Sequence, residues 1–541
     1  MSLIPSEAMS TSTDDARYVA PTPAAAADGW RVERLTPPSR LFGANGLRTG
    51  PDGRVYIAQV TGSQVSALDV DTGLLQTVSP KGGDLIAPDD VAFDSAGTMY
   101  ATEVMDGRVS ALGRDGRAVV LRDDLPCANG ITVFRDRLFV NECRDGGRLM
   151  ELDRATGAAR ILAEDLPSPN AMEVGPDGLL YYPLMTANEI WRIDPDGGEP
   201  QRVAGDLGVP DAVKFDADGH LVSTQVATGQ VLRIDPRSGD RTVLAQLTPC
   251  LDNLTFVDGR LFVSNFTGEI TEVLGDGRTR TVLPGGLNWP LDLSVDGDGV
   301  LHVADGTYFY AAAPDGSLQT VGMLFSPGYP GFLRGVAAVG AGEFVVTTSG
   351  GQVARYRPGD NETTYLATDF DQLYGVAVGP GDVVVFAELG TGRVHGLRSG
   401  AVETLGTGLH APIGVAIGPD GAPLVAESGA GRVVRLTDSG PDVVVDGLAC
   451  PQGILVRDGH LFVVDAGSKE VVAFDLTTKA RSTIASALPV GAPSGVVPKP
   501  LRGMPPFSGP QGPFAGIAAG PDGSLYVSAD GDGSVLVLRR C

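Results

Sequence analysis

The stretch Asn129–Glu142, NGITVFRDRLFVNE, sets the pattern of the whole chain. A polar start residue is followed by a run of alternating apolar residues, a tight polar turn and a second alternating run. Apolar residues at every second position, many of them β-branched or aromatic, are typical of β-strands with one buried face. Two further alternating runs, RLMELD from Arg148 and ARILAE from Ala159, complete the unit. The unit therefore predicts four short strands in about 40 residues, which is the size of one β-propeller blade.

The same unit recurs twelve times along the 541 residues. Successive units begin 39 to 44 residues apart, except that the last begins 63 residues after its predecessor. Single propellers usually hold about four to eight blades. Twelve units therefore predict an all-β chain of two six-bladed β-propellers in tandem, with twelve four-stranded blades. The units begin at Asn45, Asp89, Asn129, Asn170, Asp211, Asp252, Leu291, Arg334, Tyr374, Ile413, Gln452 and Ala515.

The boundaries of the two predicted propellers follow from the repeat. We expect residues 1–29 to be a disordered N-terminal tail, residues 30–286 to hold the first propeller and residues 287–541 the second. The last unit ends at its third strand, and residues 30–36, WRVERLT, resemble an outer strand without a blade before it. Because an unpaired strand edge is unfavourable, this strand is predicted to complete the last blade. A Pro/Gly-rich insert, residues 487–514, is expected to be a lid, a contact between the propellers or a mobile segment.

Composition argues against several classes of partner. The chain carries 66 acidic and 41 basic side chains, a formal net charge of −25, whereas nucleic acid requires a basic surface. No run approaches the ~18 apolar residues of a membrane span, and the first 29 residues lack the features of a signal peptide. Five cysteines, an odd number without metal-type spacing, favour a reducing, cytoplasmic location. A small molecule is the partner that remains.

The start residues of the units carry the candidate chemistry. In a propeller they surround one mouth of the central channel and face one another. In the predicted first propeller all six are Asp or Asn, whereas the second has neither at these positions. A preference of Asp and Asn for turns would act equally in both propellers, so the contrast favours a functional site. Oxygen ligands without Cys or His select a hard divalent cation, and carboxamides in a flexible cage favour Ca²⁺ over Mg²⁺, with Mg²⁺ and Mn²⁺ as the open alternatives. The predicted ligands are Asn45, Asp89, Asn129, Asn170, Asp211 and Asp252.

Three of these start residues carry a family resemblance. The stretches CANGITV at Asn129, SPNAMEVGPDG at Asn170 and VPDAVKFDADG at Asp211 resemble the SMP-30/gluconolactonase/LRE-like family of six-bladed propellers, with paraoxonases and strictosidine synthase-like proteins as relatives. The resemblance implies a divalent cation held by an early Glu followed by Asn, Asn and Asp. It places the last three ligands on these three residues.

The sequence departs from the family pattern at the early Glu, whose position is occupied by Asn45. Asp89 or Asp252 would restore the missing charge. Asp252 and Asn253 together resemble the Asp-Asn metal pair of paraoxonases. The second half of the chain resembles NHL repeats, and no site carries over to it.

Three functions remain open. The first is a metal-dependent hydrolase of a lactone or ester, in which the cation polarises the carbonyl group and Asp211 or Asp252 activates water. The second is a metal-dependent lyase or isomerase acting through an enolate, as in streptogramin-inactivating propellers, whose paired histidines are not evident here. The third is a non-catalytic NHL-type binding propeller. An expected aromatic cluster between the propellers favours an apolar small molecule, and its members are Trp289, Tyr308, Tyr310 and Phe325.

Acidic residues that follow the second strands are expected to have a structural role. They occur in both propellers and precede Gly-containing turns, so we expect them to cap those turns. They are Glu103, Glu142, Glu388, Glu427, Asp465 and Asp530.

Overall fold

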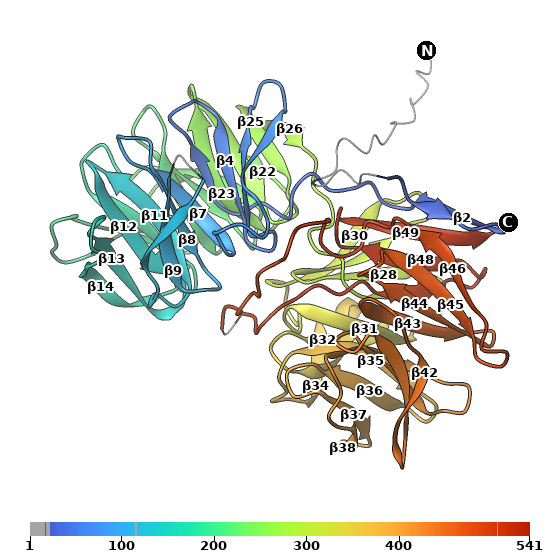
Figure 1. The fold of residues 1–541 in the computed structure, drawn as a ribbon. Helices are drawn as coiled ribbons and strands as arrows, with labels where there is room; N and C mark the ends of the chain where they lie inside the picture. Colours follow the sequence, from blue (N-terminus) through green and yellow to red (C-terminus); the bar gives the residue numbers. More distant parts are fainter. Residues whose placement is uncertain (1–16, 18–21, 114–115, 506) are drawn as a thin grey trace, which may run out of the picture.

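The computed structural model describes residues 17, 22–113, 116–505 and 507–541. These residues form twelve antiparallel sheets arranged as two six-bladed propellers, which confirms the predicted fold (Figure 1). The one helical segment among them is the 3₁₀ turn η2 (Pro358–Asp360). None of the described residues belong to a helix long and apolar enough to span a membrane. The expected disordered tail lies largely outside the described residues.

The first propeller consists of six sheets, each with its strands in sequence order from the channel outward. Its strands are β3 (Leu47–Thr49), β4 (Val55–Gln59), β5 (Gln64–Leu68), β6 (Leu75–Ser79), β7 (Pro88–Phe93), β8 (Met99–Glu103), β9 (Arg108–Leu112), β10 (Ala118–Arg122), β11 (Ala128–Phe134), β12 (Arg137–Glu142), β13 (Asp145–Leu152), β14 (Ala159–Pro167), β15 (Glu173–Val174), β16 (Leu180–Leu184), β17 (Glu189–Ile193), β18 (Gln201–Ala204), β19 (Pro210–Phe215), β20 (Leu221–Gln225), β21 (Gln230–Ile234), β22 (Arg241–Gln246), β23 (Leu251–Val257), β24 (Arg260–Asn265), β25 (Ile270–Gly275) and β26 (Arg278–Leu283).

The second propeller also has six sheets, of which the last draws a strand from the N-terminal part of the chain. Its other strands are β27 (Leu293–Val295), β28 (Leu301–Asp305), β29 (Tyr308–Ala312), β30 (Leu318–Met323), β31 (Leu333–Gly340), β32 (Glu343–Thr348), β33 (Val353–Arg357), β34 (Glu362–Ala367), β35 (Leu373–Gly379), β36 (Val383–Glu388), β37 (Arg393–Arg398), β38 (Ala401–Gly406), β39 (Pro412–Ile417), β40 (Pro423–Glu427), β41 (Arg432–Thr437), β42 (Gly440–Val445), β43 (Pro451–Arg457), β44 (His460–Asp465), β45 (Glu470–Asp475), β46 (Arg481–Ser486), β47 (Ile517–Ala519), β48 (Leu525–Ala529) and β49 (Ser534–Arg540).

The N-terminal strand completes the last blade, as the unmatched outer-strand sequence suggested. β2 (Trp30–Arg34) pairs antiparallel with β49 over five residue pairs, and Figure 1 shows the blue strand lying along the red one. The structure corrects one detail of the expected tail. β1 (Ala25–Ala26), which lies within residues 1–29, pairs with β46 instead of being disordered. Two segments near the N-terminus therefore stabilise blades near the C-terminus.

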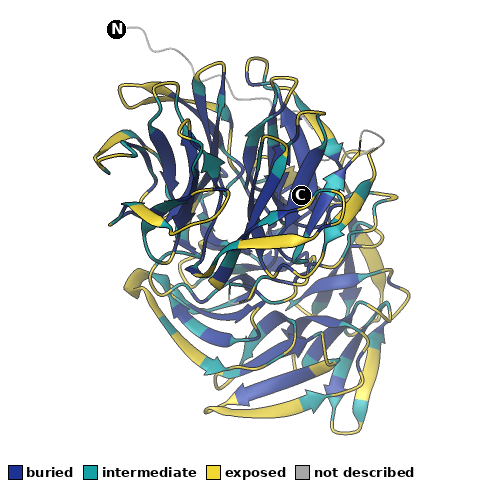
Figure 2. Ribbon diagram, turned by 90° about the vertical axis from the view of Figure 1, so that its left-hand side faces the viewer, coloured by how far each residue is buried: buried dark blue, intermediate teal, exposed yellow. Residues whose placement is uncertain are grey.

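Each propeller returns from its sixth blade to its first. In the first propeller, the Thr255 hydroxyl accepts a hydrogen bond from Thr49 N at 3.1 Å, which joins β23 to β3. In the second, Gly516 N donates to Leu291 O at 2.9 Å, next to the contact between β47 and β27. Figure 2 shows the consequence for burial, because the strands toward the channel are dark blue and the yellow segments lie in outer strands and loops. The core is therefore a stack of apolar layers between neighbouring blades.

Candidate metal site in the first propeller

One cavity at the mouth of the first propeller brings all six predicted site residues together. The space between its lining atoms, open mouth included, is about 780 Å³. Five of the six residues are buried, with Asp211 2 % exposed, and Asn45 is partly buried. No histidine lines this cavity within the described part of the chain. The six residues are Asn45, Asp89, Asn129, Asn170, Asp211 and Asp252.

A β-bulge aims four of these six side chains at the channel. In β7, β11, β19 and β23 the pairing register shifts across two residues, and the site residue is the first of the two. Bulges redirect side chains and are common next to active sites. The same bulge occurs in the second propeller, where Arg334, Tyr374, Ile413 and Gln452 occupy the position. Since the bulge forms with those residues too, it does not require Asp or Asn, and their presence in the first propeller needs another explanation.

Neighbouring blades hold the bulges in place through side chains of the second strand. The Thr102 hydroxyl donates to Asn129 O, and the Thr224 hydroxyl donates to Asp252 O. Asn141 Nδ2 donates to Asn170 O at 2.7 Å. Each of these bonds crosses from one blade to the next, so the spacing of the site residues depends on the packing between blades.

The three carboxyl groups lie close enough to perturb one another. Burial raises the pKa of Asp89 to about 7, and the charge of Asp90 adds to the effect. Burial also raises the pKa of Asp211 and of Asp252 well above the usual range, with further contributions from the neighbouring carboxylates. No Lys, Arg or His of the described residues forms an ion pair with any of the three. The cavity therefore brings together three carboxyl groups whose ionised forms are costly, because no cationic side chain among the described residues pairs with them.

This donor set fits a hard divalent cation. Asn129 Oδ1 is buried and has no hydrogen-bond partner among the described residues. Carboxylate and carboxamide oxygens are the ligands that Ca²⁺ prefers. Within the same described residues, no cluster of three or more His, Cys, Asp and Glu side chains could hold an ion by itself. A cation bound here would therefore need carboxamide oxygens in addition to the carboxylates.

The six predicted ligands are not equivalent in the structure. Asn170 Oδ1 accepts a hydrogen bond from Ala171 N at 2.7 Å, and its Nδ2 lies 3.1 Å from Met185 Sδ. The carboxamide of Asn253 does not line the cavity, because its Oδ1 accepts from Leu254 N at 2.8 Å. The resemblance of Asp252–Asn253 to a metal-binding pair therefore does not extend to the second residue.

A partly buried ion-pair network lies deeper in the channel. Arg48, Glu173 and Lys214 each follow a site residue by three positions, about 10 Å further along the inner strand. Arg48 Nη1 lies 2.7 Å from Glu173 Oε2, and Lys214 Nζ lies 3.4 Å from the same oxygen. Arg48 also donates to the carbonyl groups of Val91 and Ile131. We interpret this network as the floor that separates the cavity from the opposite mouth.

The six Asp and Asn side chains form a polar ring, and an apolar collar surrounds it. The sequence analysis did not predict this collar. The residue directly after the second strand of each blade lies 14 or 15 positions after the start residue. In five of the six blades this residue lines the cavity, and all five are apolar. The fixed spacing is the signal that would have identified them. They are Val60, Val104, Cys143, Met185 and Phe266.

The second propeller supplies the remaining wall. Phe325 and Phe332 reach the cavity from the second propeller, and Phe325 stacks on Phe266 with ring centroids 6.2 Å apart. Met504 and Phe507 of the insert also line it, and Figure 1 shows the red insert extending toward the first propeller. The expected aromatic cluster is only partly correct. Phe325 faces the cavity, whereas Tyr308 and Tyr310 are packed in the core.

The acidic residues after the second strands accept hydrogen bonds from main-chain N–H groups and basic side chains of their own blades. Glu427 accepts from His410 N at 2.8 Å and from Arg432 at 2.6 Å. Asp465 accepts from Ala449 N and Cys450 N. The expected turn-capping role is confirmed for Asp465, which also accepts from Gly467 N at 3.2 Å, and both residues in addition hold the loop before the inner strand.

Comparison with known protein families found one match, which lies mostly in the first propeller. Residues 26–265 match the family described as SMP-30/Gluconolactonase/LRE-like region, as its three stretches of sequence suggested. This part of the chain is therefore similar to that family. This region contains all six site residues, and it ends at the last residue of β24 in the sixth blade.

Several solved structures are similar to one part of the chain. A streptogramin B lyase is 18 % identical, with a TM-score of 0.38, and covers 51 % of this chain and 94 % of its own. Virginiamycin B lyase from Staphylococcus aureus is 16 % identical, with a TM-score of 0.38, and covers 54 % and 98 %. A gluconolactonase from Xanthomonas campestris is 19 % identical, with a TM-score of 0.37, and covers 45 % and 95 %. No curated protein matches the chain.

Proposed function

We propose that the first propeller is a metal-dependent hydrolase of a small-molecule lactone or ester, with Ca²⁺ as the favoured cation. One observation carries the proposal. Six Asp and Asn side chains line one buried cavity of the first propeller, while the same bulge of the second propeller carries other residues. Three buried carboxyl groups with raised pKa values are costly unless a cation or protons neutralise them.

The residues divide into separate roles. Asn129 Oδ1 has no partner among the described residues, and Asp211 is the most buried of the three carboxyl groups. We assign these two to cation binding, together with Asp89. When bound, the cation would act as a Lewis acid toward the carbonyl oxygen. Asp252 is held by a hydrogen bond from Asn45 Nδ2 at 3.0 Å, so it keeps a fixed orientation. We assign Asp252 as the base that takes the proton from the attacking water.

The substrate proposed for this site is small and largely apolar. The apolar collar and the aromatic side chains from the second propeller surround the polar ring on the open side. Such walls bind an apolar body while the few polar groups fix the reacting end. They also limit the access of bulk water, which strengthens the electrostatic interactions inside.

Metal analysis followed by a substrate panel tests the proposal. The purified protein should carry close to one equivalent of a divalent cation, and a panel of lactones and aryl esters should include substrates whose hydrolysis stops with EDTA and resumes with Ca²⁺. Product mass separates the open alternatives, because hydrolysis adds one water and elimination or isomerisation does not. Protein without bound metal, and with no chelator-sensitive turnover, would contradict the proposal.

We also propose a reducing compartment such as the cytoplasm. All five cysteines are free, and three of them are buried. Stable disulfides are typical of oxidising compartments. Titration of five free thiols in denatured, freshly purified protein tests this point.

A further inference from the structure

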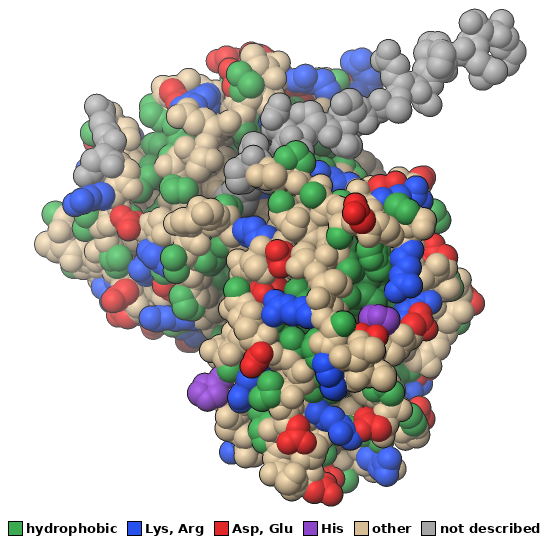
Figure 3. All heavy atoms as spheres, turned by 45° about the vertical axis from the view of Figure 1, so that its right-hand side comes forward, with side chains coloured by type: hydrophobic (Ala, Val, Ile, Leu, Met, Phe, Trp, Pro, Cys, Tyr) green, Lys and Arg blue, Asp and Glu red, His purple; other side chains and the backbone are tan. Residues whose placement is uncertain are grey.

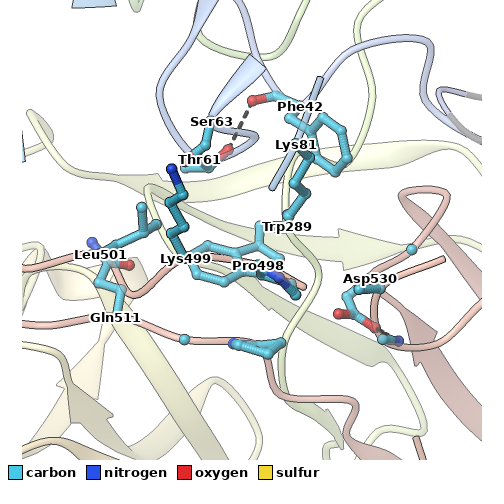
Figure 4. A pocket seen from close by; sticks show the side chains of 15 residues that line it. Phe42, Thr61, Ser63, Lys81, Trp289, Pro498, Lys499, Leu501, Gln511 and Asp530 are labelled. Atoms are coloured by element: carbon cyan, nitrogen blue, oxygen red, sulfur yellow. Dashed lines mark hydrogen bonds between the residues drawn. The ribbon is translucent and has the colours of Figure 1, made fainter. Parts of the chain in front are cut away.

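A second pocket lies between the two propellers, beside the mouth cavity. We call it the interface pocket. Phe42 and Thr61 line both spaces and form their shared wall. The interface pocket is otherwise built from Ser63 and Lys81 of the first propeller and from residues of the second, among them Trp289, Lys499, Gln511 and Asp530. Figure 4 shows these polar side chains around the ring of Trp289.

Positive charge gathers at this pocket in a strongly acidic protein. The sequence contains five lysines, and two of them, Lys81 and Lys499, line the interface pocket. Lys469 lies close by and donates to Val490 O and Ala492 O. Asp530 is the acidic residue of the lining, and its Oδ1 already accepts from Gly491 N at 2.7 Å. On the face drawn in Figure 3, by contrast, acidic and basic side chains are interspersed.

Lys81 lacks a countercharge at contact distance. Its Nζ lies 4.4 Å from the ring centroid of Phe42 and 5.8 Å from that of Trp289. No carboxylate of the described residues lies within 4.0 Å of this nitrogen. Burial lowers the pKa of Lys81 to about 8, so the ammonium is still charged at neutral pH. The aromatic rings attract the cation but do not neutralise it.

Gln511 presents a second set of unused polar atoms. This residue is 4 % exposed, and neither Nε2 nor Oε1 of its side chain has a hydrogen-bond partner among the described residues. The main chain of Gln511 is fixed, because its N–H donates to Leu501 O at 2.9 Å in a hairpin of the insert. Buried polar atoms without partners are costly, so a native protein rarely leaves an amide in this state unless a ligand or water binds there.

These observations point to one class of ligand. By the measure used for the mouth cavity, the space between the lining atoms is about 490 Å³, but the part of it that surrounding atoms leave free holds only roughly two waters. That space fits a carboxylate group and its methyl or ethyl substituent. Water would satisfy Gln511 but would leave Lys81 with only the more distant charge of Asp530. We propose that the interface pocket binds a small free monocarboxylate such as acetate, with Lys81 and Lys499 supplying charge and Gln511 a hydrogen-bond donor.

Such a ligand would connect the two propellers. Lys81 follows β6 in the first propeller, whereas Gln511 and Lys499 belong to the insert of the second. Because a ligand that binds only the folded state stabilises it, acetate should raise the melting temperature of the full chain. This inference does not depend on the proposed hydrolysis, since no residue of the polar ring takes part.

Binding of ¹³C-labelled acetate in the presence of EDTA tests the inference without the metal site. With the full-length protein, the broadening of the ¹³C-acetate resonance should saturate at acetate concentrations below about 100 mM. Acetamide, the neutral analogue, should bind at least about tenfold more weakly. Lys81→Met should weaken acetate binding by about tenfold, while Lys81→Arg, which keeps the charge, should retain most of it. The matched control is Lys479→Met, because Lys479 is exposed and does not line the pocket.

The outcomes that would overturn the inference are equally direct. They are absence of saturable acetate binding, equal binding of acetate and acetamide, or unchanged acetate binding in Lys81→Met. Circular dichroism melting of each variant shows whether it is folded. If Lys81→Met does not fold, Gln511→Leu and Lys81→Arg carry the test, and Gln511→Leu should weaken binding while leaving Lys81 in place.

Discussion

Asn45 and Asp252 are joined by a hydrogen bond across the junction of the first and sixth blades. Asn45 Nδ2 donates to Asp252 Oδ2 at 3.0 Å, and Asn45 Oδ1 accepts from Val60 N at 3.2 Å. The family resemblance implies a Glu at the position of Asn45. A Glu there would repel the carboxylate of Asp252, whereas the carboxamide orients it. The departure from the family pattern is therefore accompanied by a carboxylate one blade away, and the two residues act as a pair.

Replacement of Asp211 tests its role as a charged ligand of the cation. Asp211→Ala removes a charged ligand, so both metal content and hydrolysis should fall at least about tenfold. Asp211→Asn keeps one ligand oxygen but loses the charge, so it should lose less metal than Asp211→Ala. Inductively coupled plasma mass spectrometry and initial rates measure the two effects.

The matched control for this prediction is Gln452→Ala in the second propeller. Gln452 occupies the same bulge position, and its Oε1 accepts from Ala515 N at 2.6 Å. This variant should keep its metal and its rate. Full metal occupancy in Asp211→Ala would refute the assignment, and metal loss from Gln452→Ala would move the site to the second propeller.

The insert should set substrate preference without affecting the metal. Phe507 and Met504 line the mouth cavity, although they belong to the second propeller. Phe507→Ala should raise KM for apolar substrates by roughly three- to tenfold, because it removes apolar contact area, while metal content and the rate with the smallest substrates stay close to those of the native protein. Steady-state kinetics over esters of increasing chain length measures this effect.

Val497→Ala is the control within the same insert, since Val497 is 80 % exposed. Its kinetics should match those of the native protein. A KM for long-chain esters that is unchanged in Phe507→Ala would show that this side chain does not contact the substrate.

The fold could be predicted because each blade repeats one local pattern. The polar ring followed from that pattern, and β2 followed from an outer-strand sequence without a blade. The apolar collar was also present in the spacing, at residues such as Val104 and Met185, and was overlooked. The wall that the second propeller contributes to the cavity was not predictable in this way. Contacts such as Phe266 on Phe325 depend on how the two propellers pack against each other, and no repeat within one propeller specifies that arrangement.

The N-terminal strand should be essential for the second propeller. Trp30 packs on Phe462 with ring centroids 6.4 Å apart, and Arg34 forms an ion pair with Asp532 at 2.5 Å. Deletion of residues 1–36 removes β2 and exposes the edge of β49, so we expect the melting temperature to fall by on the order of 5–10 °C. Deletion of residues 1–28 removes β1 and Arg17 but keeps β2, so its effect should be smaller. Hydrogen exchange in β48 and β49 locates the loss, and equal protection in both truncated forms would count against this role.

Asp292 should make the second propeller less stable as the pH rises. Burial raises the pKa of Asp292 to about 7, although its carboxyl group accepts hydrogen bonds from Leu293 N and Val336 N, both at 3.0 Å. Between about pH 4, where the unfolded chain releases this proton, and about pH 7, the folded state holds the proton more tightly. The free energy of unfolding that this group contributes is therefore fully present below about pH 4 and is lost as the pH rises through about 7.

Asp292→Asn removes the titrating group and should flatten this part of the pH profile. Denaturant unfolding of the full chain at pH 5 and at pH 8 should show a fall in stability for the native protein that exceeds the fall for the variant by at most a few kcal/mol, since one pH unit corresponds to about 1.4 kcal/mol per proton. Part of the pH dependence of stability should persist in Asp292→Asn, because burial also raises the pKa of Asp305 to about 7. Asp298→Asn, at an exposed position of the same blade, should follow the native profile. Parallel profiles for the native protein and Asp292→Asn would show that Asp292 is already ionised in the folded state at pH 5.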